Sequence, residues 1–205
     1  MPKICFLYTD TNGLHKTNDY VSTKNLYKFA RLIAIHYMIG DYNGTFKSSM
    51  NKNLILKPKT IYFDKVAQSF HKITMEDAES KGIENNKAIT ELKNDLADVK
   101  IIIGHSLPFH IKAIQSECFR TAIDINFGKY ILIDTISFGH SYEHPKFTDM
   151  LVKYNINKKL TQLEQYRDLF FILYSNYIKN IKNIKNIKDN NNNNINKEDE
   201  CDFVD

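Results

Sequence analysis

The sequence predicts a single α/β domain built on a mixed β-sheet that helices flank. Two apolar runs, Lys3 to Tyr8 and Ala30 to Ile39, are expected to be paired antiparallel strands, because a polar turn ends each of them. Farther along the chain, strand-like runs alternate with helix-like runs, which indicates strands joined by helical connections. A chain of 205 residues is long enough to bury one hydrophobic core of ordinary size.

The remaining elements follow from the spacing of apolar residues. Val99 to Ile103 is a short continuous apolar run, as expected of a strand that is buried on both faces. A third antiparallel strand is expected from Asn53 to Leu56, and the last strand from Tyr130 to Ile133. The expected helices are one that starts at the capping box Thr74-Met75-Glu76-Asp77, one with apolar residues at helical spacing from Ala88 to Val99, one from Phe109 to about Ala122, and a long amphipathic one from Leu160 to Tyr177.

The domain is expected to occupy residues 1–178 and to be followed by a largely disordered tail, residues 179–205. This tail consists of Lys-Asn-Ile triplets, an asparagine run and an acidic end, and such a segment buries too little apolar surface to offset chain entropy. The net charge of the whole chain is +4. A modest positive excess permits an anionic partner such as nucleic acid without requiring one.

Cysteine usage and hydropathy predict a soluble intracellular protein of the cytoplasm or nucleus, with no membrane partner. Cys5, Cys118 and Cys201 are odd in number and far apart, which is typical of a reducing compartment. The apolar stretch from Ile4 to Tyr8 is too short for a signal peptide, and no run approaches the length of a membrane span. The sequence has neither a Gly-rich phosphate loop nor a recognisable Ser-His-Asp spacing, so it supports neither nucleoside triphosphate hydrolysis nor serine-type acyl transfer.

Asp10 stands at the end of the first expected strand, where a carboxylate on a rigid element suits a hard cation such as Mg²⁺. From Asp10 the chain reads Asp-Thr-Asn-Gly-Leu, which resembles the first motif of the DEDD-type 3'-5' exonuclease family, Asp-x-Glu commonly followed by Thr-Gly-Leu. Three later segments resemble family segments in the same order. They are Phe70 to Thr74, which resembles His-Gly-Ile-Thr; Ile103 to His110, which resembles Val-Gly-His-Asn-x-x-Phe-Asp; and Ile133 to Thr135, which resembles a strand-closing Asp-Thr.

The resemblance spans Lys3 to Asp168 and implies an RNase H-like fold of the exonuclease type, with single-stranded DNA or RNA ends as the partner. In the family, four carboxylates hold two metal ions that activate water and stabilise the leaving oxygen. Here Asp10 keeps the first place, Asn12 stands at the Glu position, and His110 stands at the Asp position of the second motif. The last motif keeps only its final residue, Asp168, so two of the four acidic ligands are replaced.

This loss removes half of the negative charge that would balance two divalent ions. We therefore expect a metal centre with Asp10, Asn12, His110 and Asp168 as ligands and with Asp10 and Asp168 as the catalytic carboxylates. Such a centre is expected to hold one Mg²⁺ or Mn²⁺ ion rather than two. The predicted function is an exonuclease-like protein that is weak or inactive as a nuclease. The alternative is a non-catalytic module that binds nucleic acid or protein on the same scaffold.

Structural interpretations compete with these assignments. Asp10 and Asn12 are also ordinary turn residues after a strand, and Asp168 alone would be a surface residue of its helix. Asp134, at a strand end, is interpreted first as a turn or capping residue. Glu164, one turn before Asp168, is either a substitute for the missing catalytic base or a solvated helix carboxylate.

Histidines suggest a rival metal site. His105 and His110, together with His140 and His144, are ligand types that zinc accepts. This alternative would make the site structural rather than catalytic.

Overall fold

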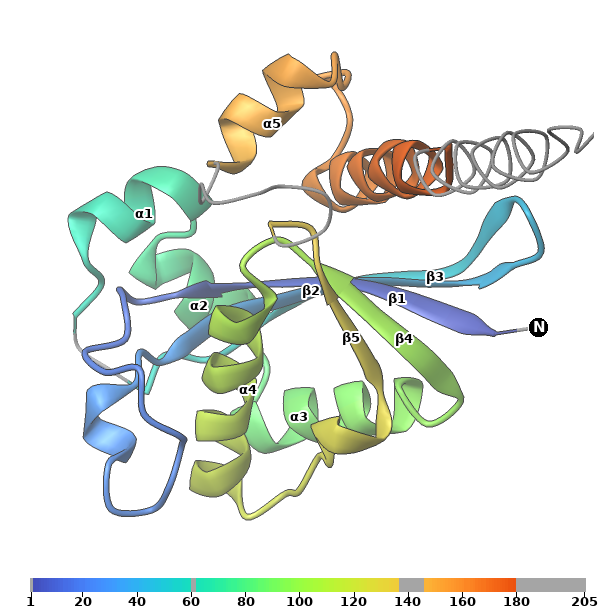
Figure 1. The fold of residues 1–205 in the computed structure, drawn as a ribbon. Helices are drawn as coiled ribbons and strands as arrows, with labels where there is room; N and C mark the ends of the chain where they lie inside the picture. The colour runs from blue at the N-terminus through green and yellow to red at the C-terminus, as the bar shows by residue number, and fades with distance from the viewer. Residues whose placement is uncertain (1, 60–61, 137–145, 180–205) are drawn as a thin grey trace, which may run out of the picture.

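Five strands form one mixed sheet with β1 at its centre (Figure 1). The chain is represented by a computed structural model that describes residues 2–59, 62–136 and 146–179. In the order of the sheet the strands are β3 (Phe46–Ile55), β2 (Leu32–Tyr42), β1 (Lys3–Thr11), β4 (Val99–Gly104) and β5 (Ile131–Asp134). The pairs β3–β2 and β2–β1 are antiparallel, and the pairs β1–β4 and β4–β5 are parallel. This arrangement confirms the predicted meander that is followed by parallel strands.

Helices cover both faces of the sheet (Figure 1). The labelled helices are α1 (Lys65–His71), α2 (Met75–Lys81), α3 (Asn85–Asp95), α4 (Leu107–Thr121) and α5 (Phe147–Lys153). A further helix over residues 162–179 reaches the end of the described chain. α3 and α4 lie on one face of the sheet, and α5 and the helix 162–179 lie on the other. The predicted tail therefore falls, except for residue 179, outside the described residues.

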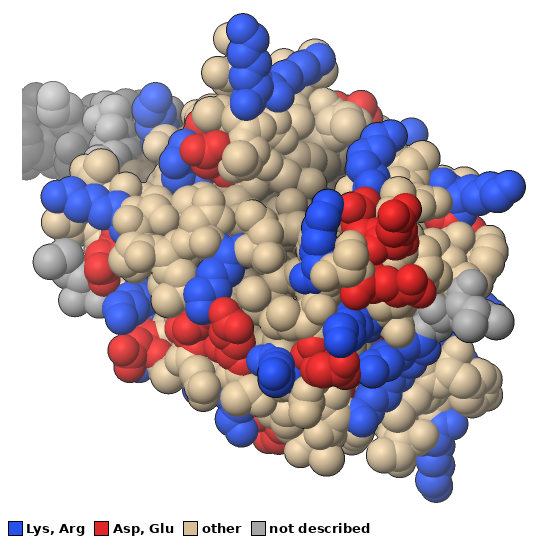
Figure 2. Space-filling view, turned by 180° about the vertical axis from the view of Figure 1, so that it is seen from behind, with Lys and Arg blue, Asp and Glu red and all other residues tan. Residues whose placement is uncertain are grey.

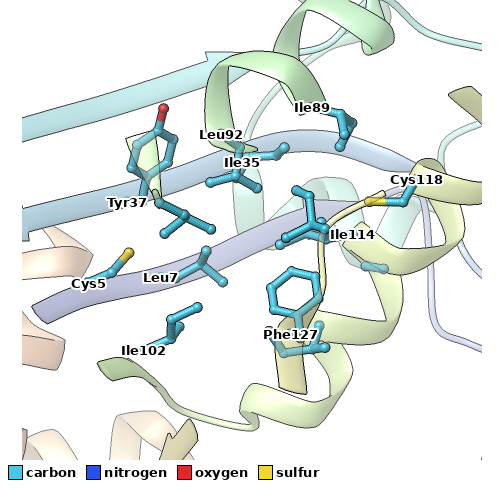
Figure 3. Packing of buried hydrophobic residues seen from close by; sticks show 14 of the residues in the cluster. Cys5, Leu7, Ile35, Tyr37, Ile89, Leu92, Ile102, Ile114, Cys118 and Phe127 are labelled. Carbon is cyan, nitrogen blue, oxygen red and sulfur yellow. The ribbon is translucent and has the colours of Figure 1, made fainter. Parts of the chain in front are cut away.

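Alternation along β1 divides the core into two layers. Cys5 and Leu7 point to the layer that also contains Ile114 of α4 (Figure 3), whereas Ile4 and Phe6 pack in a second cluster with residues of the helix 162–179. Successive side chains of a strand point to opposite faces, so a strand at the centre of the sheet is apolar on both sides. This explains why the sequence of β1 is a continuous apolar run.

Segments with a weak apolar pattern depart from the sequence prediction. β3 begins at Phe46 instead of Asn53, because its first half is a mostly polar edge strand that no apolar run reveals. The sequence pattern does not predict α1 or α5, and each has seven residues, too few for helical periodicity to be recognised. In contrast, the capping box is confirmed: Thr74 and Asp77 exchange hydrogen bonds at the start of α2.

Asp134 connects the last strand to α4 and so fixes one side of the sheet end. Its carboxylate accepts hydrogen bonds from the backbone N–H groups of Ser106 and Leu107 at 3.0 and 3.1 Å, and from that of Ile136 at 3.0 Å. A carboxylate at the first turn of a helix satisfies N–H groups that lack partners within the helix. The interpretation of Asp134 as a capping residue is therefore confirmed.

Candidate functional site at the end of strand β1

Asp10 lies near the carboxyl end of β1 and its carboxylate contacts a histidine of the neighbouring strand. Oδ2 of Asp10 is 2.8 Å from Nε2 of His36, and Nδ1 of His36 is 2.7 Å from Oδ1 of Asn53 on β3. The ring of Tyr8 stacks on His36 with 4.3 Å between centroids. One oxygen of the Asp10 carboxylate is thus already hydrogen-bonded to a protein group.

His110 is buried behind the strand end and both of its ring nitrogens have partners. Nδ1 accepts from the backbone N–H of Thr9 at 3.0 Å and lies 2.9 Å from the Thr9 hydroxyl, while Nε2 donates to the carbonyl of His105 at 3.1 Å. Burial lowers the pKa of His110 to about 4, so the ring is neutral near pH 7. In this arrangement His110 joins β1 to the start of α4.

Asn12 also serves as a connector. Its side-chain oxygen accepts from the backbone N–H of Arg31 at 2.8 Å, and its amide donates to the carbonyl of Tyr62 at 3.4 Å. Its backbone carbonyl accepts from the N–H of Asp64 at 2.9 Å. The oxygen that a metal ion would use therefore holds the segments before β2 and α1 against the end of β1.

Asp168 lies in a different groove from Asp10. It accepts a hydrogen bond from Arg167 at 2.7 Å and lines a cavity of about 640 Å³ between the helix 162–179 and the β2–β3 hairpin, where Tyr42 is also found. Asp10 is in register with Ala34 on β2, and Tyr42 lies farther along that strand by roughly 26 Å at 3.3 Å per residue. The structure thus brings Asp10, Asn12 and His110 to one strand end and does not bring Asp168 there.

The residue of the helix 162–179 that approaches the strand end is Tyr166. Its ring is 5.7 Å from the ring of Tyr8, and both side chains point into the space on the Asp10 side of β1. Burial raises the pKa of Tyr8 and of Tyr166, so both phenols stay protonated. Neutral phenols supply no negative charge to balance a cation.

The side chains at this strand end do not fit the metal centre that the resemblance implies. Within residues 2–59, 62–136 and 146–179, no three His, Cys, Asp or Glu side chains are grouped so that they could hold a metal ion. Asp10 and Asp64 are the two carboxylates that line the cavity here: Oδ2 of Asp10 is hydrogen-bonded to His36, and Asp64 caps α1. The assignment of Asp10, Asn12, His110 and Asp168 as ligands stays a prediction.

A cavity of about 520 Å³ opens beside Asp10, and its walls are largely apolar. Leu14 and Phe70 line it and are 82% and 80% exposed. Phe109 forms another wall, and its ring is held in place by stacking on His15 with 4.3 Å between centroids. Large exposed apolar side chains around one cavity are a common feature of ligand sites.

His71 adds a polar group to this cavity. Its Nδ1 accepts from the backbone N–H of Ile73 at 3.0 Å, and its buried Nε2 has no hydrogen-bond partner among the residues that the structure describes. Burial lowers the pKa of His71, so the ring is neutral and Nε2 carries the hydrogen. A buried donor without a partner costs about 1–3 kcal/mol, which indicates a place for a water molecule or a ligand acceptor.

The motifs in the sequence do not point to Tyr8, His36, His71 or Tyr166 as functional residues. Two signals were present: Tyr8 precedes Asp10 by two residues and so shares its face of the strand, and His36 interrupts an otherwise apolar strand. The partners of His71 and Tyr166 depend on tertiary packing that no local pattern specifies.

The remaining interpretations are resolved in part. Glu164 accepts hydrogen bonds from the backbone N–H and hydroxyl of Thr161 at 2.9 and 2.8 Å, so this exposed carboxylate caps the last helix. Nδ1 of His105 is 2.9 Å from the Thr135 hydroxyl. The zinc alternative also requires His140 and His144, which lie outside the described residues.

Comparisons with known proteins identify the fold. No protein-family model and no curated protein sequence matches the chain. Among solved structures, E. coli exonuclease I in complex with a dT13 oligonucleotide is similar with a TM-score of 0.53 and 15% identity, over 66% of this chain and 28% of that one. A product-bound exonuclease I is similar with a TM-score of 0.63 and 12% identity, over 82% of this chain and 42% of that one.

Exonuclease I from Methylocaldum szegediense gives comparable values: a TM-score of 0.54 and 14% identity, over 67% of this chain and 28% of that one. The chain thus spans less than half the length of these exonucleases. No helix in the described ranges has the length and apolar character needed to cross a membrane. At these identities the likeness concerns the fold, and the chain has the RNase H-like fold of exonuclease I.

Proposed function

We propose that this protein binds the end of a single nucleic-acid strand in the cavity beside Asp10 and is weak or inactive as a nuclease. The cavity carries the proposal: its volume of about 520 Å³ is within the usual range for small-molecule sites, and it opens at the end of a central strand. E. coli exonuclease I, which has this fold, has been crystallised with an oligonucleotide. A single-stranded DNA or RNA end is therefore the proposed partner.

The wall residues support binding of a base. Phe109 and the highly exposed Phe70 offer aromatic surfaces, and Leu14 offers an aliphatic one. Stacking of a base on an aromatic side chain contributes about 1–3 kcal/mol and tolerates any sequence. The unpartnered N–H of His71 supplies a donor for a base or sugar oxygen.

The surroundings of Asp10 support weak or absent catalysis. Hydrolysis by two metal ions needs anionic oxygens that balance the charge of the cations. Oδ2 of Asp10 is hydrogen-bonded to Nε2 of His36, and the phenols of Tyr8 and Tyr166 are neutral because burial raises the pKa of each. A slow 3'-5' exonuclease with one Mg²⁺ or Mn²⁺ ion remains the second candidate, because a carboxylate still lines the cavity.

The test compares binding with degradation. Labelled single-stranded DNA, single-stranded RNA and recessed-end DNA are incubated with the purified protein in Mg²⁺, in Mn²⁺ and in EDTA, and Asp10→Ala serves as the control. Binding in EDTA without degradation in either metal is the expected result. Metal-dependent degradation that Asp10→Ala abolishes would establish the slow enzyme instead. If no strand binds under any condition, the proposed function is wrong, and a protein-binding role becomes the better hypothesis.

A further inference from the structure

A second cavity, of about 480 Å³, adjoins the one beside Asp10. Both cavities are lined by Gly13, Leu14 and Asp64, so a short wall of three residues separates them. The second cavity extends toward the segment that leads into β2, where Lys28 and Arg31 lie. Because the two cavities share this wall, one ligand longer than a single nucleotide could occupy both of them.

The second cavity has a strongly basic lining. Lys16, Lys28, Arg31 and Arg120 contribute positive charges, and Asp64 is the one acidic residue among its described lining. The carboxylate of Asp64 is engaged as the cap of α1, where it accepts hydrogen bonds from two backbone N–H groups. The cavity beside Asp10, by contrast, has no Lys or Arg in its described lining.

The two arginines are held in place by a buried carboxylate. Glu117 has no exposed surface and binds Arg31 at 2.7 Å and Arg120 at 3.0 Å. Arg120 also donates to the backbone carbonyls of Leu26 and Phe29. One carboxylate for two guanidinium groups leaves a net positive charge fixed in the cavity wall, and fixed charges bind anions without a cost of ordering side chains.

The two lysines retain charge for a ligand. Lys16 is exposed and lines the cavity, and the ammonium of Lys28 is 4.0 Å from the carboxylate of the exposed Asp19, a surface ion pair of a kind that contributes little and leaves the lysine available to an anion. Tyr27, 77% exposed, completes the lining with an aromatic ring. Cations beside exposed aromatic rings are the typical composition of single-strand binding surfaces.

Charges of both signs are mixed on one face of the molecule. On the face seen in Figure 2, Lys and Arg side chains are interspersed with Asp and Glu. At the second cavity, four cationic side chains face two carboxylates, those of Asp64 and Glu117. Such local concentrations raise the affinity for phosphate.

We infer that the second cavity binds the phosphodiester and the adjacent nucleotide of the strand whose end occupies the cavity beside Asp10. This inference rests on the proposed function. It identifies the preferred ligand as a strand of at least two nucleotides and assigns phosphate binding to Lys16 and Lys28, with Arg31 and Arg120 as fixed positive charges. Phosphodiester, terminal phosphate and free phosphate share the same anionic oxygens, so the experiment must separate them.

The experiment measures the dissociation constants of inorganic phosphate, thymidine monophosphate, the dinucleotide and a short oligothymidylate, with the matching uridine series. The double variant K16A/K28A is compared with the wild-type protein and with Lys24→Ala. Lys24 is an exposed lysine of the same loop that lines neither cavity, so it controls for the general loss of positive charge. Each affinity is measured at several salt concentrations.

The double variant is expected to bind the dinucleotide and the oligonucleotide about 10-fold more weakly, with a salt slope smaller by about 1–2, because each lost phosphate contact removes close to one unit. Binding of the monophosphate should change less than 2-fold. Equal losses in K16A/K28A and Lys24→Ala, or tight binding of inorganic phosphate alone, would overturn the inference while the proposed function stands. Failure of the wild-type protein to bind any strand would overturn both.

Discussion

Nε2 of His36 lies 2.8 Å from Oδ2 of Asp10, so an imidazole occupies one side of the carboxylate that β1 itself places at its end. The two residues lie on neighbouring strands. Asp10 is in register with Ala34, and its side chain reaches His36, the next residue of β2 on the same face. The pair gives Asp10 a structural partner. It also reduces the capacity of this carboxylate to bind a cation.

Divalent metal ions are therefore expected to have little effect on stability. In thermal unfolding, millimolar Mg²⁺ or Mn²⁺ should shift the Tm by less than about 1 °C relative to EDTA, since a ligand stabilises the folded state only when its concentration exceeds its Kd. At 1,000 times the Kd the stabilisation would be about 4 kcal/mol. A rise of several degrees that Asp10→Asn abolishes would contradict this prediction and support a one-metal centre.

The exposed apolar side chains of the cavity are expected to matter for binding and not for stability. Replacing Phe70 or Leu14 with Ala should weaken binding of a single strand by about 10-fold, because each removes a surface on which a base packs. Both side chains are largely exposed, so the free energy of unfolding should change by less than about 0.5 kcal/mol.

Fluorescence anisotropy with a labelled oligonucleotide and urea denaturation measure the two effects. Val152→Ala is the matched control, because Val152 is a comparably exposed apolar residue on α5, away from the cavity lining. If the Phe70 variant binds as tightly as the control, the base does not pack where we propose.

A glycine at position 72 is expected to stabilise the protein. Lys72 follows α1 with φ of 61°, a left-handed conformation that glycine adopts without the steric cost of a Cβ atom. Lys72→Gly should raise the free energy of unfolding by about 1 kcal/mol, or the Tm by about 2–4 °C. Lys87→Gly, at an exposed position inside α3, should lower it by a similar amount, and a gain there of the same sign would refute the explanation.

The backbone of Lys72 also explains why the sequence resemblance includes the turn that ends α1. The segment that His71 to Thr74 resembles has glycine where this chain has Lys72, and the left-handed backbone of Lys72 is a conformation that favours glycine. Asp134, which also lies in a segment that carries the resemblance, accepts hydrogen bonds from the first backbone N–H groups of α4. Motifs of this kind could be predicted from the sequence because they report local backbone geometry, and they carry information on the fold more than on catalysis.

The position of Asp168 could not be predicted from the motif alone. Leu163, Tyr166 and Phe170 pack against the sheet, and a helix turns by about 100° per residue, so Asp168 points roughly 200° away from Tyr166. The amphipathic pattern of this helix places Asp168 off its apolar face, whereas the resemblance to the last motif implies a position beside Asp10. Side-chain partners such as His36 depend on strand register, which a single sequence does not specify.

The buried His110 is expected to make stability depend on pH. Its pKa is about 4 in the folded protein and about 6.5 in an unfolded chain, so between these values the unfolded state binds more protons. The contribution of His110 is fully present above pH 6.5 and is lost as the pH falls toward 4, with a total of about 3 kcal/mol.

Urea denaturation from pH 7.5 to pH 4 tests this by comparing the wild-type protein with His110→Asn, which keeps an acceptor for Thr9 and does not titrate. The variant should be less stable than the wild-type protein at neutral pH, and the difference should shrink as the pH falls. Parallel curves over the whole range would show that His110 does not titrate as its burial implies.

Glu117 is expected to be the most sensitive charged position of the fold. Its carboxylate is fully buried between Arg31 and Arg120, and Asn85 donates to it at 3.2 Å. Glu117→Ala leaves two guanidinium groups without their counter-charge and should lower the free energy of unfolding by about 3–5 kcal/mol. Glu117→Gln keeps the shape and part of the hydrogen bonding, so its loss should be smaller.

The exposed Glu79 on α2 is the matched control, and Glu79→Ala should change the free energy of unfolding by less than about 0.5 kcal/mol. Urea denaturation at neutral pH orders the three variants. The expected order of destabilisation, from largest to smallest, is Glu117→Ala, then Glu117→Gln, then Glu79→Ala.

Arg31 and Arg120 also line the second cavity. Because Glu117→Ala no longer holds these two arginines in place, it should weaken oligonucleotide binding more than binding of the monophosphate. Equal stability of Glu117→Ala and Glu79→Ala would mean that the arginines do not depend on this carboxylate.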